Sequence, residues 1–212
     1  MSAGPKRPTR AQLSALARRD PALAKAARGL PPFPGFPEPR AHDSNFHALA
    51  KAIVFQQLAG RAAQTIHDRV VALTPGTRFP LPEQILELSD AELRGAGLSR
   101  NKLLALRDLS GRITAGELSV RSLGRRSDAE VIEALTAVRG IGVWSAQIFL
   151  MFRLGRLDVL PAGDLGLRDG LRRLDGCEDR PTSAELEARG ARWAPLRSVA
   201  AWRLWRLADA PL

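Results

Sequence analysis

Residues 135–146 read LTAVRGIGVWSA, in which Gly140 and Gly142 flank a single aliphatic residue, Ile141. Apolar residues at helical spacing continue before and after the glycines. Glycine has no Cβ atom, so it adopts positive φ angles and lets a partner approach the backbone closely. The stretch therefore predicts two helices joined by a tight hairpin, with Ile141 anchoring the turn in the core.

The start of the second helix leaves backbone N–H groups without intrahelical partners, and such groups bind anions. The hairpin is therefore suited to grip a phosphate without reading base sequence. A Gly-x-Gly turn is also common as a plain connection between helices, and that interpretation stays open. A dinucleotide-binding fingerprint is excluded because no strand precedes the glycines and Ser145 stands where the third glycine belongs. A P-loop is excluded because the chain has no Gly-Lys-Ser/Thr.

The rest of the chain indicates an all-α protein. Ala, Leu and Arg, which favour helices, are abundant, and no long apolar/polar alternation predicts strands. Capping boxes, in which a hydroxyl starts a helix and a carboxylate three residues later reaches back, begin at Ser89, Ser127 and Thr182. The proline-rich stretch 31–37 predicts a linker. We expect helices at about 11–28 with a break at Asp20-Pro21, 45–59, 61–73, 90–95, 100–114, 128–137, 143–154, 183–190 and 194–208.

The chain has 212 residues and a net charge of +10, of which +6 lies within residues 1–40. This charge fits a nucleic-acid partner and equally a basic soluble protein. The single cysteine, Cys177, excludes an intramolecular disulfide and a four-cysteine zinc site. The start is polar and no apolar run is long enough for a membrane span, so we expect a cytoplasmic protein without a secretory signal.

Asp164 lies twenty residues beyond Trp144 and follows a loop rich in glycine and proline, 160–163. A hairpin, such a loop and one aspartate at a helix start resemble the helix-hairpin-helix-GPD superfamily of DNA glycosylases. Within it, the chain is most similar to the 3-methyladenine DNA glycosylases of the bacterial alkylation-inducible type, over about residues 42–208. Further similarity lies in IVFQQL at 53–58, AGLSRNK at 96–102 and WAPLRS at 193–198.

The resemblance implies a helix-hairpin-helix glycosylase fold of two helical subdomains with a DNA-binding cleft between them. Residues 41–212 are then the glycosylase domain. Residues 1–40 are a basic segment, disordered over 1–10, whose helix docks on the C-terminal helices. This segment is too short and too helical for the additional N-terminal sheet domain of the inducible relatives, so we expect a compact form.

By resemblance, Asp164 is the catalytic aspartate. A helix N-terminus keeps a carboxylate ionised, and a fixed negative charge stabilises the sugar cation that forms as the base leaves. Trp144 stands where lyase-competent members carry a lysine, so no Schiff base with the sugar is expected and the strand stays intact. We expect Trp144 to be a stacking wall for a flipped base, with a core position as the alternative.

The resemblance also places Trp205 in the base pocket, with Trp202 as the neighbouring candidate. Ile148 replaces a tyrosine of some relatives, which predicts a more open pocket. Indole faces attract positively charged, N-alkylated purines by cation–π and stacking forces. Leu58 resembles the wedge that fills the gap left by an extruded nucleotide, and Gln57 is the alternative wedge. An ordinary position at a helix end stays open for Leu58.

Contacts with the DNA backbone are expected from the hairpin and the segment 96–102, namely from Arg139, Gly140, Ile141, Gly142, Ser145, Arg100 and Lys102. For Arg100 and Lys102, a solvated helix face is the alternative. Relatives hold a monovalent cation with the carbonyl groups that match Thr136, Val138 and Gly140, so we expect Na⁺ or K⁺ at the hairpin. No organic cofactor is expected.

These residues predict a monofunctional DNA glycosylase of base excision repair, acting as a monomer at the nucleoid and not at a membrane. It is expected to flip N-alkylated bases, such as 3-methyladenine and 7-methylguanine, out of double-stranded DNA and to hydrolyse their N-glycosidic bonds. The range of alkylated bases is left open. One alternative is a non-enzymatic helix-hairpin-helix protein that binds lesions. Another is a glycosylase for uracil, mismatched thymine or oxidised purines.

Overall fold

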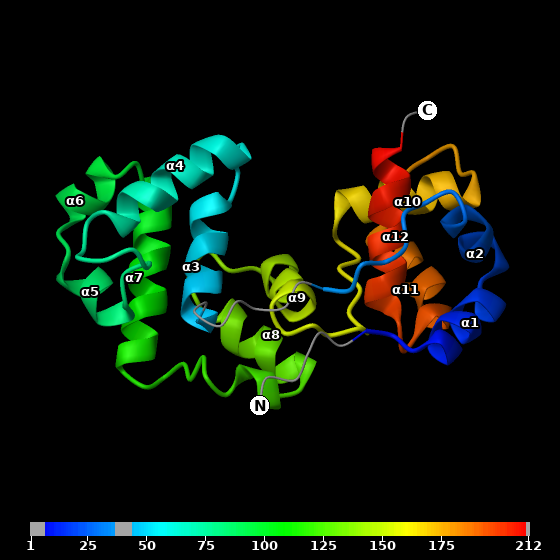
Figure 1. Ribbon diagram of the computed structural model, residues 1–212, viewed down its shortest axis with the longest axis horizontal. Helices are drawn as coiled ribbons and strands as arrows, with labels where there is room; N and C mark the ends of the chain where they lie inside the picture. The colour runs from blue at the N-terminus through cyan, green and yellow to red at the C-terminus, as the bar shows by residue number, and fades with distance from the viewer. Residues whose placement is uncertain (1–6, 37–43, 211–212) are drawn as a thin grey trace. The chain divides into compact units, whose positions relative to one another are not determined.

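The computed structural model describes residues 7–36 and 44–210, and Figure 1 labels the helices of that part. Within it the secondary structure consists of α-helices and short 3₁₀-helices with no strand, so the predicted all-α class is confirmed. No helix of the described part is long and apolar enough to cross a bilayer. The chain divides into two compact units. The terminal unit joins Met1–Glu38 to Leu150–Leu212, and the central unit is Pro39–Phe149.

The terminal unit is built from both ends of the chain. Its helices are α1 (Arg10–Arg19), α2 (Pro21–Ala27), α10 (Leu165–Asp175), α11 (Ser183–Gly190) and α12 (Arg197–Asp209), with the 3₁₀-helix η2 (Ala191–Trp193). Helix α2 packs against α10 and α12, and α10 packs along α12. The break between the first two helices occurs at Asp20 and Pro21, where the sequence predicted it.

Asp20 joins the N-terminal helices to the end of α11. It is 2% exposed and caps α2 by accepting the N–H of Leu23 at 3.0 Å. The same carboxylate accepts the indole N–H of Trp193 at 2.7 Å and pairs with Arg189, which also pairs with Asp175 at 2.8 Å. Burial raises the pKa of Asp20, but its hydrogen bonds, that from Arg189 first, outweigh burial and hold this pKa below its ordinary value.

The proline-rich segment 31–36 contains no helix, as its prolines predicted, but it is more than a linker. Phe33 packs edge-on against Trp202 of α12, with ring centroids 5.6 Å apart. Phe36 is buried and packs edge-on against Phe152 at 5.2 Å. Because the rings of Phe33 and Phe36 also touch each other, the segment covers an aromatic face of the terminal unit.

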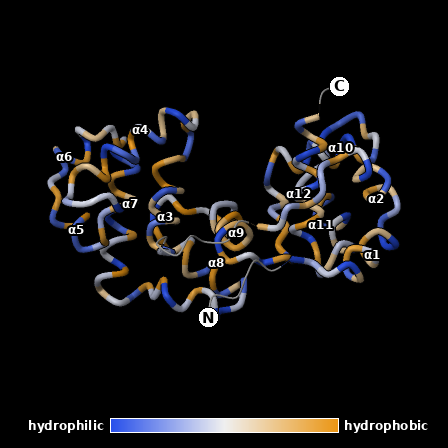
Figure 2. The backbone as a smooth tube through the Cα atoms, viewed as in Figure 1, coloured by the Kyte–Doolittle hydropathy of each residue, from blue (hydrophilic) through white to orange (hydrophobic). Residues whose placement is uncertain are grey.

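The central unit contains the helices that the sequence predicted and one that it missed. They are α3 (Asn45–Phe55), α4 (Gly60–Val71), α5 (Pro82–Glu87), α6 (Asp90–Gly95), α7 (Arg100–Thr114), α8 (Asp128–Thr136) and the start of α9 (Val143–Phe152), with the 3₁₀-helix η1 (Leu123–Arg125). Helix α5 was missed because Pro82 was expected to interrupt the chain. Proline is in fact favoured in the first turn of a helix, where its missing N–H removes no hydrogen bond. Helix α9 is mostly apolar (Figure 2).

The three predicted capping boxes are confirmed. The hydroxyl groups of Ser89, Ser127 and Thr182 each accept the N–H of a glutamate three residues later, and that glutamate bonds back to the cap. These bonds are local, and they start α6, α8 and α11 at the predicted residues.

Helix α3 ends at Phe55, earlier than predicted. Gln56 has left the helical conformation, with φ −53° and ψ 133°, and Gln57 has a positive φ of 55°. The prediction of a helix through Leu58 was wrong. It rested on the apolar spacing, which Leu58 continues, but Leu58 is 39% exposed and lies outside the helix. Residues 56–59 therefore form a sharp turn between α3 and α4, called the 56–59 turn below.

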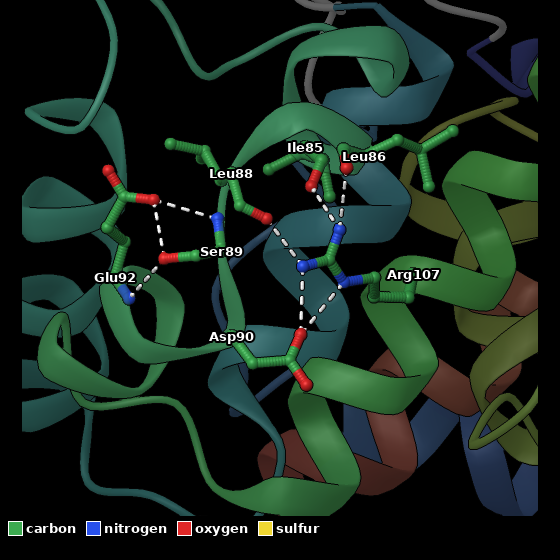
Figure 3. A network of polar contacts seen from close by, with 7 residues as sticks. All are labelled: Ile85, Leu86, Leu88, Ser89, Asp90, Glu92 and Arg107. Carbon is green, nitrogen blue, oxygen red and sulfur yellow. Dashed lines mark hydrogen bonds and ion pairs between the residues drawn. The ribbon is translucent and has the colours of Figure 1, made fainter.

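Arg107 of α7 binds the ends of two shorter helices (Figure 3). Its guanidinium donates to the carbonyl groups of Ile85, Leu86 and Leu88, where α5 ends. It also donates to the carboxylate of Asp90, in the first turn of α6, at 2.8 Å. The last carbonyl groups of a helix lack intrahelical partners, so Arg107 satisfies the end of α5 and joins it to α6 and α7.

Candidate active site

Asp164 is the N-cap of α10 and lies at the end of a tight turn. Its backbone N–H donates to the carbonyl of Pro161 at 2.9 Å. Its Oδ1 accepts the backbone N–H of Leu167 and the indole Nε1–H of Trp205, both at 2.9 Å. Two donors on one oxygen fix the direction of the carboxylate, and the helix N-terminus favours its negative charge. The side chain is half-buried, so this charge is held in place without being closed off from solvent.

Two glycines of α10 allow this arrangement. A Cβ atom on Gly166 would lie 3.1 Å from Oδ1 of Asp164 and 3.2 Å from Cδ1 of Trp205. A Cβ atom on Gly170 would overlap the backbone carbonyl of Leu204 in α12. The two helices therefore approach closely at Gly170, and this approach brings the indole of α12 to the cap of α10.

The loop that leads to Asp164 is anchored by the first residues of α12. The guanidinium of Arg197 donates two hydrogen bonds to the carboxylate of Asp158, at 2.8 and 2.9 Å, and the backbone N–H of Arg197 donates a third at 3.2 Å. The buried hydroxyl of Ser198 accepts the N–H of Val159 at 2.9 Å. Both residues belong to the C-terminal motif that the sequence singled out, and the structure shows that they hold the loop before the aspartate.

Of the two candidate tryptophans on α12, Trp205 is the one that reaches Asp164. Its ring lies 5.9 Å from that of Phe152 at an interplanar angle of 34°. Trp202 instead lies under the guanidinium of Arg206 and against the proline-rich segment. Phe152, which is 38% exposed, was not predicted as a site residue. It ends the apolar run of α9, which was the one sequence signal that could have indicated it.

The hairpin between α8 and α9 has the predicted form at one glycine and not at the other. Gly140 has a positive φ of 77°, and an added Cβ atom would lie 3.2 Å from Cβ of Ala105 in α7. Gly142 has no positive φ, so that part of the prediction was wrong; its carbonyl accepts the first hydrogen bond of α9, from Ala146. Ile141 is 5% exposed and anchors the turn in the core, as expected.

Side chains of other elements hold the hairpin from both sides. The carboxylate of Asp108 in α7 accepts the backbone N–H of Arg139 at 2.8 Å and also pairs with Arg112. The side-chain amide of Gln56 donates to the carbonyl of Gly140 at 2.9 Å. Gln56 was not singled out in the sequence, because no local spacing relates the end of α3 to the hairpin.

Trp144 and Ile148 belong to the central unit, on α9. Trp144 is 48% exposed, which excludes the alternative that its side chain is part of the core. Ile148, one turn later, is half-buried. Asp164 and Trp205 belong to the terminal unit, where they contact each other directly.

Comparison with known proteins decides which family contains this arrangement. The model of the HhH-GPD superfamily of base excision DNA repair proteins matches residues 50–195, a span that includes both the hairpin and Asp164. The chain belongs to the HhH-GPD superfamily. The resemblance drawn from the sequence is therefore confirmed.

Individual relatives of this HhH-GPD protein are similar over most of their length. It is 34% identical over 162 residues to DNA-3-methyladenine glycosylase 1 of Schizosaccharomyces pombe, covering 76% of this chain and 71% of that one. The crystal structure of DNA-3-methyladenine glycosidase from Bacillus halodurans is similar with a TM-score of 0.83 and 35% identity, over 94% and 89% of the two chains. The S. pombe 3-methyladenine DNA glycosylase in complex with abasic DNA is similar with a TM-score of 0.77 and 30% identity, over 95% and 98%.

The remaining predicted contact residues of the HhH-GPD chain lie in the central unit. Arg100 is exposed at the first residue of α7. Lys102 donates its ammonium to the carbonyl of Val54 at 2.7 Å, and burial lowers the pKa of Lys102. Gln57 and Leu58 are both exposed in the 56–59 turn. Ser145 lies half-buried at the start of α9.

The three carbonyl groups expected to hold a monovalent cation lie at the end of α8 and in the hairpin. That of Val138 accepts the N–H of Ile141 at 3.1 Å, and that of Gly140 accepts Gln56. A carbonyl oxygen has two lone pairs, so the carbonyl groups of Val138 and Gly140 can each take a further partner. No group of three His, Cys, Asp or Glu side chains within the described residues is arranged to hold a metal ion.

Proposed function

We propose that this protein is a monofunctional DNA glycosylase that removes N-alkylated bases from double-stranded DNA. The observation that carries the proposal is the carboxylate of Asp164, which caps α10 and accepts the indole N–H of Trp205. The names of the relatives that are 30% to 35% identical support 3-methyladenine and similar bases as the substrate class.

The proposed reaction is hydrolysis of the bond between C1′ of the sugar and the nitrogen of the base. The electron pair of this bond leaves with the base, so a cationic 3-methyladenine departs as a neutral molecule. Water bonds to C1′ through its oxygen and releases one proton to solvent. Positive charge develops at the sugar before water attacks, and the fixed negative charge of Asp164 stabilises that state.

We propose Trp205, which contacts Asp164, as an indole face that binds the flipped base. In the central unit we propose Trp144, with Ile148 one turn beyond it, as a stacking residue in its own right. N-alkylated purines carry positive charge, and an indole face attracts a cation by about 1–2 kcal/mol. The packing of Trp202 against Phe33 supports Trp205 over Trp202 for this role. An indole cannot form a Schiff base with the sugar, so the DNA strand is expected to stay intact.

We propose that the hairpin and the exposed residues near it bind the DNA backbone. Arg139, Gly140 and Gly142 are exposed, which leaves this loop open to a phosphate. The similar S. pombe enzyme was solved with abasic DNA. Na⁺ or K⁺ held by the carbonyl groups of Thr136 and Val138, together with Gly140, would add positive charge beside that phosphate.

Release of free base from methylated duplex DNA tests the proposal, with strand integrity measured before and after alkali. The wild type is expected to release 3-methyladenine and 7-methylguanine and to leave the strands intact until alkali is added. Asp164→Asn is expected to lose at least about 100-fold in rate. The matched control is Asp169→Asn, on the same helix but paired with Arg180, which is expected to keep its rate. Tight binding without release by the wild type would support a lesion-binding protein instead.

A further inference from the structure

Two hydrogen bonds between residues far apart in the sequence connect the end of α3 to other parts of the central unit. Gln56 donates its side-chain amide to the carbonyl of Gly140 in the hairpin at 2.9 Å. Lys102 of α7 donates its ammonium to the carbonyl of Val54 at 2.7 Å. Val54 lies in the last turn of α3, whose carbonyl groups lack intrahelical partners, so the ammonium satisfies the helix end.

One face of α7 supports both the 56–59 turn and the hairpin. Lys102, Ala105 and Asp108 follow one another at intervals of three residues, which places them on the same side of a helix. Lys102 binds the end of α3, Ala105 lies against Gly140, and Asp108 accepts the N–H of Arg139. The turn and the hairpin therefore share a common base, and the side chain of Gln56 bridges them above it.

The 56–59 turn also contains the one non-glycine residue with a positive φ in the described part of the chain, Gln57. This conformation is unfavourable for a residue with a Cβ atom and persists where the surroundings hold it. The hydrogen bond from Gln56 and that from Lys102 act immediately before this residue. Gln57 and Leu58, whose side chains are exposed, come directly after this backbone segment, which the two hydrogen bonds hold in place.

We propose that Gln56 and Lys102 are positioning residues that keep the 56–59 turn preformed, so that Leu58 or Gln57 meets the duplex in fixed register with the hairpin. The inference rests on the proposed function. It assigns Lys102 to support of the turn instead of to a phosphate contact, since the side chain is half-buried and its ammonium is directed at the carbonyl of Val54. A preformed turn would lower the cost of extruding a nucleotide, because the inserted side chain need not be ordered at that moment.

The first test needs the protein alone and measures backbone order parameters by ¹⁵N relaxation. Gln56→Met keeps the length of the side chain and removes the donor. The backbone order parameters of residues 57–59 are expected to fall from about 0.85 in the wild type to below about 0.6 in the variant. The matched control is Gln64→Met, on the exposed side of α4, where the amide donates to Asp68 and not to the turn. Unchanged order in Gln56→Met would overturn the inference whatever the wild type does to DNA.

The second test separates positioning from phosphate contact for Lys102. In Lys102→Met, the slope of log K against log salt for undamaged duplex DNA is expected to match that of the wild type. A lost phosphate contact would reduce the slope by about 0.9, and that result would overturn the assignment of Lys102.

The third test compares two substrates in single-turnover excision. The loss of one hydrogen bond in Gln56→Met is expected to lower the excision rate about tenfold on a paired lesion. On a lesion opposite an abasic site the rate is expected to fall less than about threefold, because the lesion base is already unpaired and poorly stacked. Equal losses on both substrates would contradict a role in extrusion. If the wild type released no base at all, the proposed function would fail, and the order parameters would still decide whether Gln56 holds the turn.

Discussion

The indole N–H of Trp205 and the carboxylate of Asp164 are joined by a hydrogen bond of 2.9 Å. The oxygen that accepts this bond also caps α10 through the N–H of Leu167. Trp205 therefore has a role besides the proposed one of a flat face for the base. It connects the direction of the carboxylate to the packing of α12 against α10.

Replacement of Trp205 by phenylalanine keeps an aromatic face and removes the N–H. We predict that Trp205→Phe lowers the single-turnover excision rate about tenfold, because Oδ1 of the carboxylate loses the indole N–H donor. Binding to undamaged duplex DNA should change little. Rapid-quench measurement of base release checks the rate, and a rate equal to that of the wild type would show that only the aromatic face matters.

Gly166→Ala should disturb the same pair from the other side. Its new methyl group would lie 3.1 Å from Oδ1 of Asp164 and 3.2 Å from Cδ1 of Trp205, so the carboxylate and the indole have to shift apart from it. We predict a loss of excision rate of tenfold or more at nearly unchanged helical content. Gly111→Ala on α7 is the control, because an added Cβ atom there meets nothing within 4 Å. Full activity of Gly166→Ala would mean that the position of the carboxylate is not critical.

Arg107 is expected to matter for stability and not for chemistry. Arg107→Met leaves the carbonyl groups at the end of α5 without their donor, at a cost of about 2 kcal/mol in the free energy of unfolding. Urea denaturation measures this loss. Arg180→Met removes an exposed pair with Asp169 and should lose less. Equal losses in the two variants would contradict the role of Arg107 shown in Figure 3.

The lowered pKa of Asp20 predicts that the free energy of unfolding decreases in acid. Its pKa is lowered in the folded protein, so the unfolded chain binds a proton first as the pH falls. The stabilisation is complete above the ordinary aspartate pKa of about 4 and is lost below it, through the folded pKa. Asp20→Asn should be less stable than the wild type at pH 7, and the difference should shrink below about pH 4. A difference in unfolding free energy between the two proteins that stays the same at all pH values would contradict this prediction.

The sequence predicted best those features that depend on neighbouring residues. The capping residues Ser89, Ser127 and Thr182 bond to a backbone three residues away, so the helix starts follow from local pattern alone. The same local logic failed at Pro82 and at Leu58. A proline starts a helix as well as it ends one, and an apolar residue at helical spacing can equally lie exposed in a turn.

Residues of the candidate site were likewise predicted where a local pattern marks them and missed where only tertiary contacts bring them together. The place of Asp164 at a helix start follows from the loop before it, whereas its partner Trp205 came only from family resemblance. Phe152 and Phe36 were missed, because the contact between them joins distant segments and leaves no spacing in the sequence. The bond from Gln56 to the hairpin is likewise a product of tertiary packing.

The most direct test of the role of Asp164 is a binding comparison of two duplexes, one with a neutral tetrahydrofuran abasic analogue and one with a cationic pyrrolidine analogue. If Asp164 stabilises positive charge at C1′ as proposed, the protein should bind the cationic sugar analogue more tightly than the neutral one. We predict a preference of at least about 100-fold for pyrrolidine in the wild type and a loss of most of it in Asp164→Asn. An equal preference in both proteins would contradict electrostatic stabilisation by Asp164.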